Sequence, residues 1–322
     1  MRVSRRSLLF LPALGLSPRR VASRSAPLAP SQSANIRALF GGDIMLSRYV
    51  GRLARQKHDP AWPLHEVADL FGSADIAFAN LESPFSDHGG NIEKGMVFRA
   101  EPEMVAALEA AGIDVVSTAN NHVRDCGSHG IEFTLDLLAK HGILAAGTAP
   151  TGKLAHEGVI LARKRVGFGF LGYTFDQSNG NHSDVDERVA MMQTDRMRAD
   201  VSALRERTDV VIVSMHAGSE YQLTPNVFQQ RFARAAIDAG ATLVVGHHPH
   251  VVQPVEQYRD GVIFYSLGNL VFDQFQSEKT QRGWIADVRF TGPRIASWGI
   301  IPIDIVKTVA RVHRVAVARA ES

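Results

Sequence analysis

Short apolar runs alternate with amphipathic segments along the chain from Asn35 onward. Apolar runs of about four to eight residues between turn-forming residues are typical of strands, and apolar positions spaced by three or four residues indicate helices. The strands predicted in this way before residue 250 cover 36–40, 75–79, 113–118, 158–161, 166–173, 209–215 and 241–245. The predicted helices cover 62–71, 102–111, 131–141, 200–207 and 227–239.

The order of these elements predicts the fold class. Strands that alternate with helices are typical of βαβ units. Residues 158–161 and 166–173 form a predicted hairpin in a second set of strands, and the polar residues 178–185 form a predicted loop. Residues 251–318 combine β-branched and aromatic side chains with Gly and Pro breaks, which indicates mostly strands and a second sheet. We therefore predict an α/β fold with two packed sheets flanked by helices.

The first 35 residues have the pattern of a targeting segment. The pair Arg5-Arg6 precedes an apolar stretch, residues 8–16, that is too short to span a bilayer. This pattern predicts a twin-arginine-type signal and linker over 1–35, an exported, periplasmic protein and a single domain over 36–320. The alternative is a disordered basic tail or a misassigned start codon. The later sequence contains no stretch suited to a stable transmembrane segment.

Composition narrows the classes of function. With 322 residues, of which 45% are hydrophobic and 21% charged, the chain can bury a sizeable core without crosslinks. Its net charge of +2 becomes −4 when the six arginines of residues 1–26 are left out, and the rest has no long basic run. We therefore expect no nucleic-acid partner. The only cysteine, Cys126, cannot form an intramolecular disulfide and is interpreted as a small packing residue rather than a nucleophile.

Side chains that could bind a metal follow five of the apolar runs. These residues are Asp43, Asn80 with Glu82, Asn121 with His122, His216, and His248 with His250. In open α/β sheets ligands bind at the carboxyl ends of the strands, so we expect these side chains to converge. Carboxylate, amide and imidazole groups without a thiolate suit one or two divalent ions, namely Zn, Mn or Fe(II).

The His248-Pro249-His250 segment gives the strongest metal signal. Two histidines separated by one proline could direct their rings toward two adjacent ions, and His247 precedes them. Three histidines in four residues directly after an apolar run are not the usual pattern of surface histidines. Other histidines, including His88 and His129, have no such context and are interpreted as ordinary.

Six motifs together indicate a family. They are Gly41-Gly42-Asp43-Ile44-Met45, Asn80-Leu81-Glu82, Ser117-Thr118-Ala119-Asn120-Asn121-His122, His216-x-Gly218-x-Glu220-Tyr221, Gly246-His247-His248-Pro249-His250-Val251-Val252-Gln253 and Ser266-Leu267-Gly268-Asn269. In this order and spacing the chain resembles, from Arg37 to Phe272, the CapA (poly-γ-glutamate capsule) family of the calcineurin-like metallophosphoesterase superfamily. One departure is Ala217, where the family commonly has Trp, so a wall of the pocket is open to question.

The resemblance implies a layered α/β/β/α double sheet and a set of residue roles. The implied metal ligands are Asp43, Glu82, Asn121, His216, His248 and His250. His122 would stay free to protonate a leaving group, with Asp125 orienting it. Substrate contacts are expected from Asn80, Glu220, His247 and Asn269.

Two residues depart from the superfamily's metal motifs. By the same resemblance, Met45 stands where metallophosphoesterases usually have a histidine ligand, and Glu82 stands in place of a bridging aspartate. A thioether is a poor ligand for hard or borderline ions, so occupancy of the first metal position stays open. Glu220, four residues after His216, would orient an imidazole or contact an amine-bearing substrate, or would be a plain surface charge.

Two functions therefore stay open. The first is metal-assisted hydrolysis of a phosphoester or of an amide in a γ-glutamyl or other envelope polymer. The second is a non-catalytic, metal-binding subunit of a capsule synthesis or export machine that binds an anionic polymer. Met45 favours the second function, whereas His122 beside Asn121 favours the first.

Overall fold

The computed structural model describes residues 34–88, 96–176, 184–313 and 319–321. Arg5, Arg6 and almost all of the predicted signal and linker over 1–35 lie outside this range, as does most of the predicted loop 178–185. The signal, the linker and the domain limits 36–320 therefore stay predictions. Within the described residues no helix is both long and apolar enough to cross a membrane.

The first sheet contains the N-terminal strand at its centre. Its strands lie in the order β14 (Val309–Val312), β13 (Arg294–Val306), β12 (Arg282–Thr291), β1 (Asn35–Ile44), β2 (Ile76–Leu81), β3 (Val115–Ser117) and β4 (Leu144–Ala146). Two short strands extend it, since β11 (Asn269–Val271) pairs with β1 and β15 (Arg319–Glu321) pairs with β13. The strands β1 to β4 are parallel, so their carboxyl ends lie at one edge.

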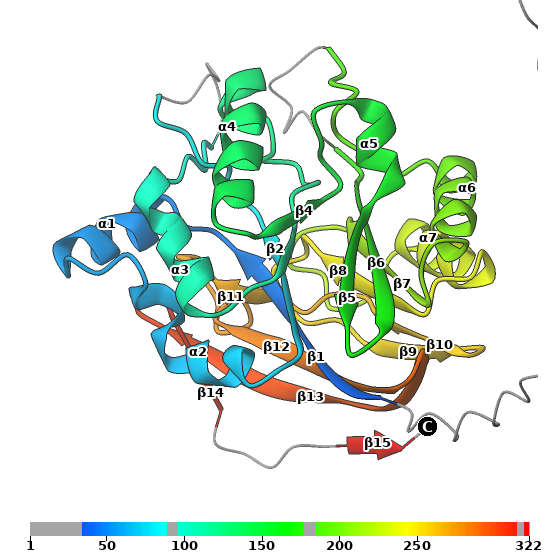
Figure 1. The fold of residues 1–322 in the computed structure, drawn as a ribbon. Coiled ribbons are helices and arrows are strands. Elements are labelled where there is room, and N and C mark those ends of the chain that lie inside the picture. Colours follow the sequence, from blue (N-terminus) through cyan, green and yellow to red (C-terminus); the bar gives the residue numbers. More distant parts are fainter. Residues whose placement is uncertain (1–33, 89–95, 177–183, 314–318, 322) are drawn as a thin grey trace, which may run out of the picture. The chain divides into compact units, whose positions relative to one another are not determined.

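The second sheet lies against the first (Figure 1). Its order is β5 (Val159–Arg163), β6 (Val166–Thr174), β7 (Val210–His216), β8 (Leu243–His247), β10 (Gly261–Phe264) and β9 (Val255–Tyr258). The four central strands are parallel, and the two edge strands pair antiparallel. Buried residues from both sheets form one cluster, in which Phe78 stacks on Phe170 with ring centroids 5.9 Å apart.

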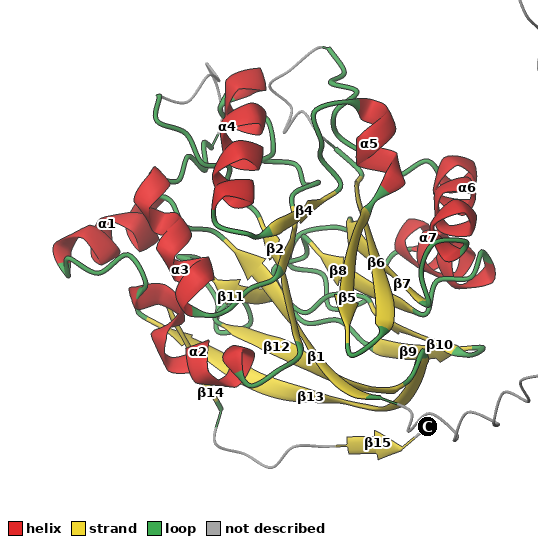
Figure 2. Ribbon diagram, in the orientation of Figure 1, coloured by secondary structure: helices red, strands yellow, loops and turns green. Residues whose placement is uncertain are grey.

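Helices cover the outer face of each sheet, as Figure 2 shows. Those packed through a shared apolar cluster on the first sheet are α1 (Arg48–Gln56), α2 (His65–Gly72), α3 (Val105–Ala110) and α4 (Gly127–Lys140), with 3-10 turns at Trp62–Leu64 and Pro102–Met104. Those packed on the second sheet are α5 (Gly152–Glu157), α6 (Thr194–Arg205) and α7 (Val227–Asp238). The predicted α/β/β/α layering, two sheets flanked by helices, is confirmed.

The later strands depart from the prediction. Residues 251–318 were expected to supply a second sheet, but β9 and β10 extend the second sheet while β11 to β14 complete the first. The reason is that β1 has an open side: β12 pairs with its first half from Asn35 to Phe40, and β11 pairs with its end at Asp43 and Ile44.

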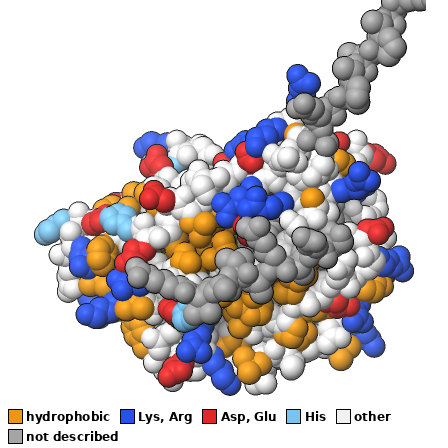
Figure 3. Space-filling view, turned by 90° about the horizontal axis from the view of Figure 1, so that it is seen from below, with side chains coloured by type: hydrophobic (Ala, Val, Ile, Leu, Met, Phe, Trp, Pro, Cys, Tyr) orange, Lys and Arg blue, Asp and Glu red, His pale blue; other side chains and the backbone are white. Residues whose placement is uncertain are grey.

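Figure 3 shows the surface on the side opposite α4 and α5. Apolar side chains lie there between Lys, Arg, Asp and Glu side chains, with both signs of charge interspersed.

Candidate metal centre

Strand register brings the predicted site residues together. In the first sheet Asp43 is paired with Asn80 of β2 on one side and with Asn269 of β11 on the other. In the second sheet His216 of β7 is paired with His247 of β8. Asp43, Asn80, His216 and His247 lie at or near the carboxyl ends of parallel strands, which is where α/β sheets bind ligands, and Asn269 is the first residue of β11.

Two glycines allow the backbone to close around this edge. A Cβ atom on Gly42 would lie 1.9 Å from the carbonyl oxygen of Gly268, and one on Gly246 would lie 2.0 Å from that of Tyr265. No side chain fits at either position. The close approach lets Asp43 N–H donate to Gly268 O at 3.0 Å, and this bond fixes the backbone position from which the Asp43 side chain extends.

Asp43 is the central carboxylate of the site and is completely buried. Its Oδ1 accepts a hydrogen bond from Asn80 Nδ2 at 2.8 Å and lies 3.4 Å from His247 Nδ1, while its Oδ2 lies 3.4 Å from His250 Nδ1. Burial opposes ionisation, but the close approach of the His247 and His250 rings outweighs it and holds the pKa of Asp43 well below its usual range. Asp43 is therefore the anionic anchor of the group.

Glu82 is a second fully buried carboxylate, and neither of its oxygens has a hydrogen-bond partner among the described residues. The nearest cationic group is His250 Nε2, 3.5 Å from Oε1. Burial raises the pKa of Glu82 well above its usual range, because no donor compensates the lost hydration. A buried carboxyl of this kind is satisfied either by protonation, which its raised pKa favours, or by a bound cation.

His248 and His250 are held in unusual backbone conformations, with φ of +94° and +57°. Residues other than glycine rarely adopt such angles, and they persist where the surroundings enforce them, often at functional sites. Burial, together with the charge of His250, lowers the pKa of His248 to about 3. The imidazole of His248 is therefore neutral, which is the form that binds metals, and its Nδ1 has no partner in the described part of the chain.

These donors fit a divalent cation. Six buried atoms of the site have no hydrogen-bond partner within the described ranges: Asn80 Oδ1, both oxygens of Glu82, both ring nitrogens of His247 and Nδ1 of His248. One ligand atom each from Asp43, Glu82 and His250 lie within 4.8 Å of one another, as do those from Glu220, His248 and His250. His250 belongs to both groups, and oxygen and nitrogen donors without sulfur suit Zn, Mn or Fe(II).

Two further predicted ligands, His216 and Asn121, contact each other in the structure. His216 Nε2 lies 2.8 Å from Asn121 Oδ1, and His216 Nδ1 lies 3.3 Å from Asn80 Nδ2. Burial and the neighbouring His248 lower the pKa of His216 well below its usual range, so its ring is neutral as well. The His216 ring lies 5.0 Å from the His248 ring, so His216 and Asn121 lie next to the donor groups. The two ring nitrogens of His216 face the side-chain amides of Asn121 and Asn80.

The predicted acid–base residue lies beside the donors. His122 is buried, its Nδ1 lies 2.8 Å from Asp125 Oδ2, and its ring stacks on Phe98 with centroids 3.7 Å apart. The ring of Phe98 in turn lies 5.6 Å from that of Phe272, which is 4.8 Å from the ring of His250. Phe98 was not predicted as a site residue, because nothing in its local sequence distinguishes it from a core aromatic.

The two positions that depart from the superfamily pattern are both accounted for. Met45 is fully buried in the core beneath the helices, and its sulfur accepts a hydrogen bond from Ser47 Oγ at 3.0 Å. Ala217 is buried in the core under α6 and α7.

The remaining predicted substrate contacts, Asn269 and Glu220, lie at the site. Asn269 Oδ1 is 3.0 Å from His250 Nδ1, and Glu220 is exposed beside His248 and His250.

Comparison with known proteins decides the family. The model of the family described as bacterial capsule synthesis protein PGA_cap matches residues 37–274. The chain belongs to this family. The matched range nearly coincides with the span from Arg37 to Phe272 that carries the motifs, so the predicted family is confirmed.

The chain is also similar to proteins from two bacilli. The chain is 32% identical over 273 residues to the PGA biosynthesis protein CapA of Bacillus subtilis, covering 83% of this chain and 71% of that protein. It is 30% identical over 289 residues to the capsule biosynthesis protein CapA of Bacillus anthracis, covering 87% and 70%. Among solved structures, a putative 5'-nucleotidase from Staphylococcus aureus in complex with alpha-ketoglutarate is similar at 11% identity and a TM-score of 0.45, over 89% of this chain and 54% of that one.

Proposed function

We propose that this PGA_cap protein is an exported, metal-dependent hydrolase that acts on an anionic substrate of the cell envelope. The observation that carries the proposal is the fully buried, unpartnered carboxylate of Glu82 beside Asp43 and His250. Without a cation there, the protein would have to bury this carboxylate uncompensated or keep it protonated, as its raised pKa allows, and either choice costs stability.

The chain's own groups support hydrolysis. A divalent ion held by Asp43, Glu82, His248 and His250 would lower the pKa of a bound water and polarise the bond to be cleaved. His122, next to these donors but outside both donor groups, supplies a proton to the leaving group. Asp125 orients the ring of His122 through a contact of 2.8 Å between Oδ2 and Nδ1.

The proposed substrate is a phosphoester or an amide of a γ-glutamyl or other envelope polymer. The names of the two bacillar relatives, which refer to PGA and capsule biosynthesis, support the polymer. Glu220 stands exposed at the site and suits contact with an amine group of such a substrate.

A second function is supported by Met45. Its sulfur is bonded to Ser47 and buried in the core, so the position that carries a histidine ligand in metallophosphoesterases supplies no ligand here. A site with fewer ligands suits a metal-binding subunit of a capsule synthesis or export machine, in which the ion would bind an anionic polymer without cleaving it.

Metal analysis followed by a hydrolysis screen separates these functions. The protein is purified without a polyhistidine tag and its metal content measured, and it is then incubated with aryl phosphates and γ-glutamyl peptides. The hydrolase proposal expects bound metal and turnover that a chelator abolishes. Bound metal without turnover of either class supports the binding subunit, and a protein that takes up no divalent ion contradicts both.

A further inference from the structure

A second group of metal-binding side chains lies at the surface, apart from the buried donors. His88 Nδ1 lies 2.6 Å from Asp87 Oδ1, and His129 Nε2 lies 2.7 Å from the same oxygen. The two ring nitrogens are 3.1 Å apart, and the rings meet edge to face with an interplanar angle of 87°. Three donor atoms from two distant segments therefore point at one spot. In the sequence the two histidines looked ordinary, because the pairing joins positions 41 residues apart.

Hydrogen bonding alone does not account for this triangle. If both histidines donate to Asp87, their N–H groups lie side by side and repel each other. Exposed ion pairs are also weak, and the side chains of Asp87, His88 and His129 are 47%, 72% and 47% exposed. A metal ion in place of the protons removes the conflict. Donor atoms around a tetrahedral zinc ion, with Zn–N bonds of about 2.0–2.1 Å, lie about 3.3 Å apart. The two nitrogens are already 3.1 Å apart, whereas the N···O distances of 2.6 and 2.7 Å would lengthen when the ion binds.

We propose that Asp87, His88 and His129 form a second metal site that binds a divalent transition-metal ion, with Zn²⁺ as the favoured occupant. Two imidazoles and one carboxylate make a three-ligand set of the kind that binds zinc and leaves a coordination position open for water or another ligand. Because all three side chains are largely exposed, an ion reaches them directly from solvent. This site is distinct from the buried group, with which it shares no residue.

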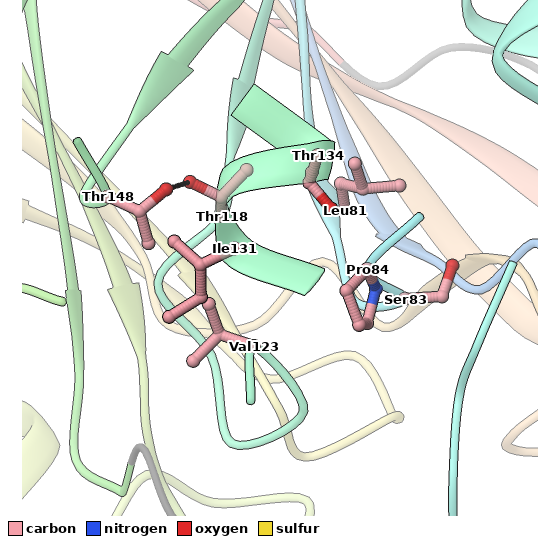
Figure 4. A pocket seen from close by; sticks show the side chains of 8 residues that line it. All are labelled: Leu81, Ser83, Pro84, Thr118, Val123, Ile131, Thr134 and Thr148. Atoms are coloured by element: carbon pink, nitrogen blue, oxygen red, sulfur yellow. Dashed lines mark hydrogen bonds between the residues drawn. The ribbon is translucent and has the colours of Figure 1, made fainter. Parts of the chain in front are cut away.

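The ion would connect the two segments that carry the proposed catalytic groups. Asp87 follows Glu82 by five residues in the segment after β2, and His129 follows Asp125 by four residues in the first turn of α4. These segments already meet: Phe85 N–H donates to Thr134 Oγ1 at 2.8 Å, and Leu81, Pro84, Ile131 and Thr134 line one small pocket between them (Figure 4). The surface ion therefore braces the position of Glu82 relative to the His122–Asp125 pair.

Zinc binding tests the proposal directly. The tag-free protein, its His88→Ala and His129→Ala variants and a control, His141→Ala, are dialysed against Zn²⁺ and the bound ions are counted. His141 lies at the end of the same helix and contacts Glu109, not the proposed site. We expect each of His88→Ala and His129→Ala to bind one ion fewer than the wild type, and His141→Ala to match the wild type. Equal zinc content in all four proteins would overturn the proposal.

Two additional measurements keep this result separate from folding and from the buried site. Without zinc, His129→Ala should melt at the wild-type temperature, since its side chain is exposed, whereas added Zn²⁺ should raise Tm less in the variant. Asp43→Ala should lose metal from the buried group and keep the surface ion, so the Asp43→Ala/His129→Ala double variant should lose both. If Asp43→Ala alone already removes the ion that His129→Ala removes, there is no independent surface site.

Discussion

Asp125 holds the imidazole of His122 in place: Oδ2 and Nδ1 are 2.8 Å apart, and only 1% and 7% of the two side chains is exposed. The same Oδ2 accepts a hydrogen bond from Phe98 N–H at 2.7 Å, and the Phe98 ring stacks on His122. The imidazole is thus oriented from its edge and supported on its face. Such an arrangement suits a group that transfers a proton at a fixed point.

His122→Ala should lower turnover by about 10²–10⁴-fold, the usual contribution of a general acid or base. Metal content should stay at the wild-type level, because His122 belongs to neither buried donor group. Turnover of an aryl phosphate and metal content per chain are the two measurements. A His122→Ala protein that loses as much metal as His248→Ala would show that His122 is a ligand and that its proposed role is wrong.

Asp43→Ala and His248→Ala should both lose bound metal and stability. Each removes a donor at the buried site, and a ligand that binds only the native state stabilises it by mass action. We expect a lower Tm than wild type when metal is present, and a smaller difference after chelation. Metal analysis and thermal melts with and without a chelator check this, with His141→Ala as a histidine variant outside the site. Unchanged metal content in both variants would place the metal elsewhere.

Met45→Leu should leave metal content unchanged. The Met45 side chain is buried in the core and its sulfur is bonded to Ser47, so it contributes packing rather than coordination. Exchange of methionine for leucine conserves volume and typically costs less than about 1.5 kcal/mol. Metal content and the free energy of unfolding of Met45→Leu are compared with those of wild type. Metal loss in this variant would mean that the thioether is a ligand after all.

Export tests the predicted twin-arginine signal. Lys in place of both Arg5 and Arg6 keeps the positive charge and removes the arginine pair, so we expect transport to stop. The matched control replaces Arg19 and Arg20, a second pair that follows the apolar stretch, with Lys. Fractionation of cells should find the first variant inside and the control exported. Normal export of the first variant would rule out the twin-arginine assignment.

The fold was largely predictable because apolar runs determine where buried strands lie. The run predicted at 209–215 corresponds to β7 (Val210–His216), and that at 241–245 is shifted by two residues from β8 (Leu243–His247). Helix α1 (Arg48–Gln56) was missed, since only Val50, Gly51 and Ala54 of its nine residues are buried and three of the others are arginines. Pairing of the late strands with β1 was also missed, because partner choice depends on contacts between distant segments.

The site was predictable to the extent that it follows from strand ends. Asp43, Glu82 and His250 converge as expected, since parallel strands place their carboxyl ends at one edge. Local sequence did not indicate that His216 would bond Asn121, or that His129 would meet Asp87. Both contacts depend on the loops after the strands, whose paths the hydrophobic pattern does not determine.

Gly246→Ala should unfold or strongly destabilise the site while Gly72→Ala should not. Gly246 directly precedes His247 and His248. A Cβ atom at Gly246 would lie 2.0 Å from Tyr265 O and 3.0 Å from Phe264 O, and these backbone oxygens cannot move away without moving the strand. The strand β8 would have to move away from β10, with which it pairs at Val245 and Phe264, and the histidines would move with it. We expect the free energy of unfolding to fall by about 3 kcal/mol or more, the upper end for overpacking, together with loss of bound metal.

Gly72→Ala is the control. At Gly72, the last residue of α2, an added Cβ meets nothing within 4 Å, so the free energy of unfolding should change by less than about 1 kcal/mol. Urea unfolding and metal analysis of both variants decide the matter, and a Gly246→Ala protein with wild-type stability and metal content would show that this close approach does not position the histidines.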